Sequence, residues 1–202
     1  MNPVLRFRPL DPPYCGDQGG WWPESSGPAR LAVAEPVPLT LALIDGMGHG
    51  ADAERSALVA KSYIAQHYHE PDLAQIIIGC DGVLKRTRGA TMIVGRIDYQ
   101  QQLFAFAGVG NCSAIIYRSD RSSVRLVSDV GIVGVGFSQL LVESIPVQPG
   151  DLVVLHTDGI RERMHLNNYG SVILNDSSRL ADALIADWGK QIDDVAVLVV
   201  QI

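Results

Sequence analysis

The chain reads LTLALIDGMGHG from Leu39 to Gly50. Its first half is a short apolar run typical of a buried strand, and an Asp-Gly pair ends it. Three glycines within residues 46–50 then allow the backbone to come close to a ligand. Apolar side chains recur every three to four positions over residues 53–68, which is typical of a helix. The stretch therefore predicts a strand, a ligand-binding loop and a helix in succession.

Two hypotheses fit this loop. The first is a nucleotide-binding loop, because a strand, a glycine-rich loop and a helix also accompany the pattern G-x-G-x-x-G. Here the third glycine comes one residue early, and the carboxylate of Asp45 would repel a pyrophosphate. The second hypothesis is a metal site, in which Asp45 and a nearby carbonyl provide hard oxygen ligands.

The remaining apolar segments predict hairpins. Residues 91–97 and 103–107 flank one polar turn, and residues 114–117 and 124–127 flank another. Helices do not alternate with strands, which argues against a parallel doubly wound sheet. We therefore expect antiparallel sheets, each covered by helices on one face. Further strands are predicted at residues 140–147, 152–156 and 195–202, further helices at 73–84 and 180–188, and irregular loops at 9–38.

Composition narrows the class of protein. The 202 residues suit one domain, and a net charge of −6, from 16 basic and 22 acidic residues, argues against a dominant role in nucleic-acid binding. No apolar run reaches the roughly 18 residues of a membrane span, and no signal peptide is visible. Cys15, Cys80 and Cys112 are widely spaced, as expected of free thiols in a reducing cytoplasm.

Aspartates stand at the ends of several predicted strands. Asp158 follows the run 152–155, Asp193 and Asp194 precede the last strand, and Asp17 lies in a glycine-flanked turn. Each alone can be a turn residue, but antiparallel strands bring the end of one beside the start of the next. Two carboxylates about 4 Å apart repel by roughly 4 kcal/mol at an effective dielectric near 20. A cluster would need a cation, and oxygen ligands favour magnesium, manganese or calcium.

Six short words match a known family in order and span nearly the whole chain. They are Cys15-Gly16-Asp17, Asp45-Gly46-Met47-Gly48-His49-Gly50, Thr87-Arg88-Gly89-Ala90-Thr91, Gly108-Val109-Gly110-Asn111, His156-Thr157-Asp158-Gly159 and Asp193-Asp194. On these words the chain resembles the metal-dependent serine/threonine phosphatases of the PPM (PP2C-like) class. Within that class it is similar to the compact bacterial branch that includes SpoIIE and, most closely, RsbX.

The resemblance implies an α+β fold, an α-β-β-α sandwich of two antiparallel sheets flanked by helices. It implies that residues 1–202 form a single catalytic domain without a sensor or regulatory domain. It also implies a centre with two divalent ions, Mn²⁺ or Mg²⁺. In the family pattern Asp45 bridges both ions, the Gly46 carbonyl binds one, and Asp158 and Asp193 hold the other. Asp17 supports the second ion directly or through water.

Other positions carry weaker expectations. Asp194 replaces a residue that follows the last family ligand, so we expect it to lie behind the ligands. Arg88 is expected to bind phosphate or substrate, or to be a surface arginine. His49 is expected either to transfer a proton or to be a loop residue. The family's phosphate-binding arginine near the N-terminus has only Arg6 and Arg8 as counterparts, outside the matching words.

The implied activity is hydrolysis of phosphoserine or phosphothreonine in a protein by a metal-bridging hydroxide, with Asp45 and Asp158 as catalytic residues. The implied substrate is a stress-signalling regulator, such as a stressosome component with a STAS domain. We expect a cytoplasmic monomer with no nucleic-acid or membrane partner. A non-catalytic regulator that docks a phosphoprotein on the same fold is the alternative.

Overall fold

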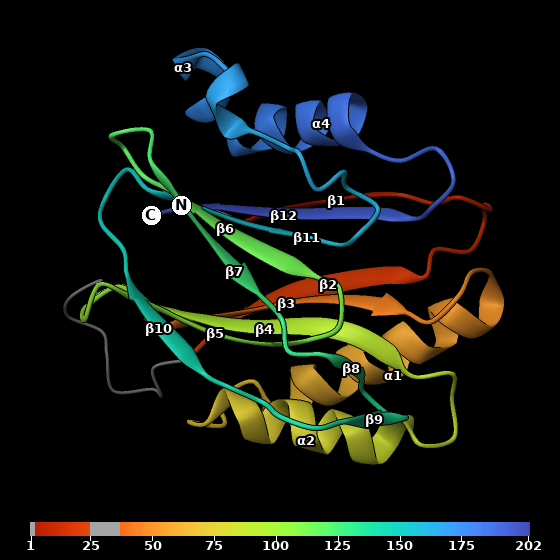
Figure 1. Cartoon of the computed structure of the whole chain (residues 1–202). Helices are drawn as coiled ribbons and strands as arrows, with labels where there is room; N and C mark the ends of the chain where they lie inside the picture. The colour runs from red at the N-terminus through yellow and green to blue at the C-terminus, as the bar shows by residue number, and fades with distance from the viewer. Residues whose placement is uncertain (1–2, 25–36) are drawn as a thin grey trace.

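The computed structural model describes residues 3–24 and 37–202. In these residues two five-stranded antiparallel sheets pack face to face, and helices cover the outer face of each (Figure 1). One sheet has the order β10-β5-β4-β3-β2, and the other has the order β1-β12-β11-β6-β7. This arrangement confirms the predicted α-β-β-α sandwich.

The first sheet contains β2 (Asp17–Pro23), β3 (Leu39–Gly46), β4 (Ala90–Asp98), β5 (Leu103–Val109) and β10 (Glu143–Pro146). The second contains β1 (Val4–Arg8), β6 (Ser113–Tyr117), β7 (Ser123–Val127), β11 (Leu152–His156) and β12 (Val195–Gln201). A small ribbon pairs β8 (Gly131–Ile132) with β9 (Gly136–Phe137). The helices are α1 (Ala51–His67), α2 (Leu73–Leu84), α3 (Ser171–Leu174) and α4 (Ser177–Trp188), with a 3₁₀ turn at Leu166–Asn168.

Strand β3 is buried on both faces, which explains its continuous apolar sequence. Leu41 and Leu43 face the second sheet and join the core between the sheets. Ala42 and Ile44 point the other way and pack under α1 and α2. The strand is thereby fixed from both sides, and its last residues are held rigidly at the edge of the sandwich.

Helices α1 and α2 form the layer over the first sheet (Figure 1). A glycine in the middle of a helix is normally unfavourable, yet Gly79 lies within α2. A Cβ atom at Gly79 would overlap the phenol of Tyr63 in α1. The glycine therefore lets the two helices pack closely.

The chain from β3 to β4 decides against the nucleotide-loop hypothesis. Strand β3 leads through α1 and α2 into β4, and β3 and β4 pair in antiparallel register. A dinucleotide-binding loop belongs to a unit of parallel strands. The glycine-rich loop of this chain therefore serves a different architecture.

The prediction of irregular loops over residues 9–38 is wrong at β2. Gly19, Gly20 and Pro23 give this segment a weak strand propensity, but it pairs with β3 along its whole length. Trp21 on this strand is 40% exposed. The part of this prediction that falls on residues 25–36 lies outside the described residues.

Three smaller differences concern edges. Strand β1 was not predicted, although its alternating Leu5-Arg6-Phe7-Arg8 suits an edge strand. Strand β10 is shorter than the predicted 140–147, and the short α3 was not predicted. The helices that cover the sheets lie where the periodicity placed them. Among the described residues, none of the helices combines the length and the apolar character needed to cross a membrane.

Candidate active site

The first sheet places two aspartates side by side. Asp45 is the seventh residue of β3, and the register pairs it with Asp17 on β2 and with Thr91 on β4. Directly opposed residues of an antiparallel pair share a face, with Cβ atoms about 5 Å apart. Asp17 is almost fully buried, at 1% exposure. Two carboxylates are therefore neighbours at the end of this sheet.

The second sheet brings three more aspartates to the same end. Asp158 comes two residues after β11, and Asp193 and Asp194 directly precede β12. The backbone amide of Thr157 donates to the Ala196 carbonyl at 3.1 Å, which continues the β11–β12 pairing beyond the strand. The two chain segments that carry aspartates thus run next to each other.

Hydrogen bonds join the two groups of acids across the sandwich. The Thr157 hydroxyl donates to Asp17 Oδ2 at 2.8 Å. Asp194 accepts from the amides of Gly16, at 2.8 Å, and Leu10, at 2.6 Å. The predicted acids therefore meet at one rim of the sandwich, which we call the aspartate rim: Asp17, Asp45, Asp158, Asp193 and Asp194.

The aspartate rim is electrostatically unfavourable by itself. Burial, which is the largest cause, and the charges of Asp158, Asp193 and Asp194 together raise the pKa of Asp45 to about 8. Burial also raises the pKa of Asp17 well above its ordinary value, and Asp45 adds to this shift, while the Thr157 hydrogen bond opposes it. The pKa of Asp193 is raised by burial and by Asp158. These carboxylates are the kind of hard oxygen donors that suit a divalent cation.

The acids share a rim without closing into a cage. Across residues 3–24 and 37–202, no three His, Cys, Asp or Glu side chains lie close enough together to hold a metal ion as they stand. Repulsion between the carboxylates, which adds to the effect of burial on these pKa values, also resists closer approach. A cation between the carboxylates would remove that repulsion.

The glycine-rich loop is pinned beside the rim. The Gly46 amide donates to the Gly16 carbonyl at 3.0 Å, and the Met47 amide donates to the Gly89 carbonyl at 3.1 Å. A Cβ at Gly46 would overlap the backbone of Ala53 in α1, so only glycine fits there. Gly48 has a φ of 89°, which also favours glycine.

Arg88 and His49 lie outside the cluster of acids. Arg88 Nη2 donates to Asp52 Oδ2 at 2.8 Å, and its Nη1 lies 3.1 Å from an ideal Cβ position at Gly48. The guanidinium therefore rests over the glycine-rich loop, with half of its side chain exposed. His49 is exposed on the same loop.

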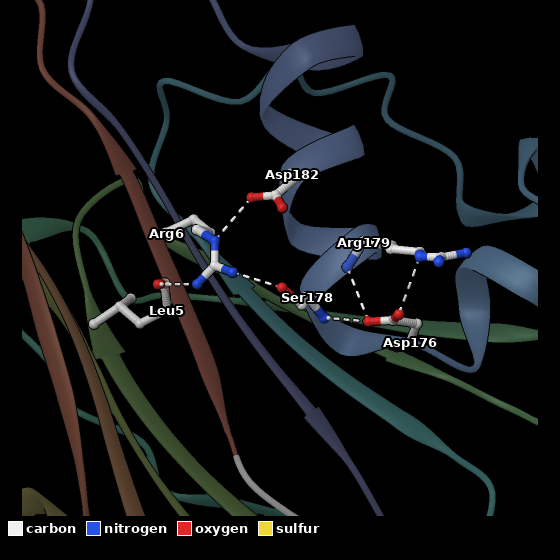
Figure 2. Close-up of polar contacts among 6 residues, drawn as sticks. All are labelled: Leu5, Arg6, Asp176, Ser178, Arg179 and Asp182. Carbon is white, nitrogen blue, oxygen red and sulfur yellow. Dashed lines mark hydrogen bonds and ion pairs between the residues drawn. The ribbon is translucent and has the colours of Figure 1, made fainter.

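Arg6 points away from the rim. Its Nε donates to Asp182 Oδ1 at 2.8 Å and its Nη2 to Ser178 Oγ at 2.6 Å, both on α4 (Figure 2). Arg8 Nη2 donates to the Lys190 carbonyl. Arg6 thus ties β1 to the helix layer, and its place in the sequence does not make it a phosphate ligand.

Three polar residues that were not predicted are linked to the acids directly or through one another. They are Thr157, Thr91 and Asn111, whose Nδ2 donates to Asp158 Oδ2 at 2.7 Å. Each lies within one of the six matching words; Thr157 precedes Asp158, and Thr91 is opposite Asp45 in the sheet. Their position in those words was the signal that could have found them.

Comparison with known proteins now adds to this geometry. Residues 37–202 match the family model described as Stage II sporulation protein E (SpoIIE). The chain is 28% identical to "Phosphoserine phosphatase RsbX" of Bacillus subtilis (strain 168) over 149 residues, which cover 72% of this chain and 74% of that protein.

Solved structures show the same fold. One, from work on the bacterial stressosome as a modular system adapted to control secondary messenger signalling, has a TM-score of 0.82 and 28% identity, covering 98% of this chain and 97% of that chain. RsbX in complex with magnesium has a TM-score of 0.77 and 20% identity, covering 98% and 92%. The chain belongs to the SpoIIE family of PP2C-like protein phosphatases.

Proposed function

We propose that this chain is a divalent-metal-dependent phosphatase that removes phosphate from serine or threonine in a regulatory protein. The observation that carries the proposal is the aspartate rim, where the pKa of Asp45 is raised to about 8 by burial and by three other aspartates. A rim that gathers this much negative charge calls for cations, and its oxygen donors suit Mn²⁺ or Mg²⁺.

The residues present fit a centre with two such ions. Asp45 and the Gly46 carbonyl would hold one, Asp158 and Asp193 would hold the other, and Asp17 would support the second directly or through water. Bound there, divalent ions lower the pKa of water and so supply a nucleophile near neutral pH. Asp194, held by the amides of Gly16 and Leu10, would instead anchor the segment that carries Asp17.

Arg88 is the group that the chain offers to a phosphoryl oxygen. It rests over the glycine-rich loop, and its ion pair with Asp52 holds it there. Arginine donates two parallel hydrogen bonds to phosphate, which orients as well as attracts it. In this proposal Arg88 binds substrate phosphate next to the aspartate rim, and exposed His49 is available to carry a proton.

The relatives suggest the substrate class. One is named a phosphoserine phosphatase, and one solved neighbour comes from work on the stressosome. We therefore assign this enzyme a phosphorylated stress regulator of the STAS-domain type. The proposal describes a cytoplasmic monomer in which residues 1–202 form one catalytic domain.

The test is release of phosphate from a phosphoserine peptide by EDTA-treated protein, with and without added Mn²⁺. We expect turnover only with the cation, and its loss in Asp45→Asn. Asp182→Asn is the matched control, because it removes one carboxylate charge at the α4 edge, where Asp182 pairs with Arg6. Activity that survives EDTA contradicts the metal mechanism, and Mn²⁺ binding without turnover favours the docking regulator.

A further inference from the structure

Two threonines on opposite sheets are each linked by hydrogen bonds to an acid of the other sheet, Thr157 directly and Thr91 through Asn111. Thr157, after β11, donates directly to Asp17 on β2 at 2.8 Å. Thr91, on β4, donates to Asn111 Oδ1 at 2.7 Å, and Asn111 Nδ2 donates to Asp158 at 2.7 Å. The two connections cross the sandwich in opposite directions.

The direction of the first connection follows from its neighbours. Thr157 Oγ1 accepts a hydrogen bond from the Ala196 amide at 3.0 Å. Its own proton is therefore free to point at Asp17 Oδ2, to which the hydroxyl donates. Thr157 has no exposed surface, so this geometry is held by packing.

The direction of the second connection is equally constrained. The NH₂ group of Asn111 faces Asp158, and its amide oxygen faces the Thr91 hydroxyl, so each end of the amide has a partner of the matching kind. Cys112 Sγ lies 3.5 Å from Thr91 Oγ1. Burial raises the pKa of the Cys112 thiol well above its ordinary value, so the thiol stays protonated and can donate to Thr91.

Both connections join the sheets at the aspartate rim, where carboxylates of the two sheets repel each other. Asp17 belongs to the first sheet and Asp158 follows a strand of the second, and each is tied to a hydroxyl-bearing residue across the gap. One hydrogen bond occupies part of a carboxylate's acceptor capacity and leaves lone pairs for a cation. Groups behind metal ligands commonly orient them in this way.

We propose that Thr157 and the Thr91–Asn111 pair are positioning residues, which fix the spacing and orientation of Asp17 and Asp158 for divalent cations. This inference rests on the proposed function, because it assigns these residues a role toward the cations of the same site. It predicts that their loss weakens cation binding before any substrate is present.

The experiment is calorimetric titration of EDTA-treated full-length variants with Mn²⁺, beside thermal unfolding of the metal-free proteins. Asn111→Ala should weaken affinity by about 10- to 100-fold, as expected when a group behind a metal ligand is removed. Asn111 is exposed, so the metal-free melting temperature should stay that of the wild type. Asn167→Ala is the matched control, since exposed Asn167 bonds the Tyr117 hydroxyl on the far face of the second sheet.

Thr157 tests the other connection. Thr157→Val should weaken Mn²⁺ binding, and Thr157→Ser, which restores the hydroxyl, should recover most of it. Wild-type affinity in Asn111→Ala overturns the inference, as does a Thr157→Ser protein that binds no better than Thr157→Val. If wild-type protein hydrolyses phosphoserine only with Mn²⁺ while Asn111→Ala binds normally, this inference alone fails. If wild-type protein shows no cation-dependent hydrolysis, the proposed function fails instead.

Discussion

Strand β11 is preceded by a buried aspartate, Asp151, and followed by a second aspartate, Asp158. The two carboxylates differ in the partners that the chain gives them. Asp151, 1% exposed, accepts from Arg118 Nη1 at 2.7 Å and from the amides of Gln148 and Ser119, at 2.9 and 3.2 Å. At the other end, Asp158 lies among four further aspartates and accepts from a neutral amide.

A buried aspartate at one end of β11 therefore has an ion-pair partner, whereas an equally buried aspartate at the other end has none in the part of the chain that the structure describes. Asp17 is as buried as Asp151, yet among the described residues no arginine or lysine forms an ion pair with Asp17 or Asp45. Asp151 is neutralised by the chain's own cation and serves the structure. Asp17 and Asp45 have no such ion pair within residues 3–24 and 37–202, and we assign that role to a cation from solution.

The largest effect is expected for Asp45→Asn. Phosphatase activity with saturating Mn²⁺ should fall by more than about 100-fold, beyond the usual effect of groups that act on metal ligands indirectly. The metal-free protein should not lose stability, because a neutral amide replaces a buried carboxyl group whose ionisation is disfavoured by burial and by the neighbouring acids. Steady-state kinetics and urea unfolding measure the two effects, and a variant that unfolds yet keeps its activity per folded molecule would show a turn residue instead.

The opposite pattern is expected for Arg118→Met. Removing one partner of a buried ion pair leaves Asp151 uncompensated, which should lower the free energy of unfolding by about 3 kcal/mol. Activity per folded molecule should stay at the wild-type value, because the pair lies at the far end of β11 from the aspartate rim. Urea unfolding and active-fraction measurements check this, and a selective loss of turnover would break the contrast between the two ends.

A smaller effect is expected in the pH dependence of metal-free stability. The unfolded chain ionises Asp45 near its ordinary pKa of 3.8, whereas the folded chain keeps the proton until about pH 8. Between these two pH values the folded state therefore binds more protons than the unfolded state. The contribution of Asp45 to the free energy of unfolding is greatest below pH 3.8 and is lost as the pH rises to about 8.

Urea midpoints in EDTA across this window measure that slope. Wild-type protein should lose stability toward higher pH, and Asp45→Asn should lose less, since Asp17 with its raised pKa contributes in the same direction. Identical slopes in the two proteins would show that Asp45 does not titrate in this window.

The smallest change in stability is expected at the exposed Arg88–Asp52 pair. Arg88→Gln and Asp52→Asn should each alter the free energy of unfolding by less than about 1 kcal/mol, as is usual for surface ion pairs. If Arg88 binds phosphate, KM should rise clearly in Arg88→Gln and less in Asp52→Asn. An unchanged KM in Arg88→Gln would make it an ordinary surface arginine.

The sequence predicted the layers and the acids because both depend on local patterns. Strand β3 is apolar on both faces, and the turns of the β4–β5 and β6–β7 hairpins lie within a few residues of their strands. Strand β2 escaped prediction because its glycines and tryptophans gain strand geometry only from pairing with β3. Thr157 and Asn111 escaped for a related reason: their hydrogen bonds join residues 140 and 47 positions apart.

The central claim is that cations bind at the aspartate rim and not at the buried acid on the far end of β11. Anomalous diffraction from a crystal of the full chain soaked in Mn²⁺ tests this most directly. We predict anomalous density among Asp17, Asp45, Asp158 and Asp193. We predict none beside Asp151, where the guanidinium of Arg118 already occupies the position that a cation would take. Ordered crystals soaked in Mn²⁺ that show no density at the aspartate rim would contradict it.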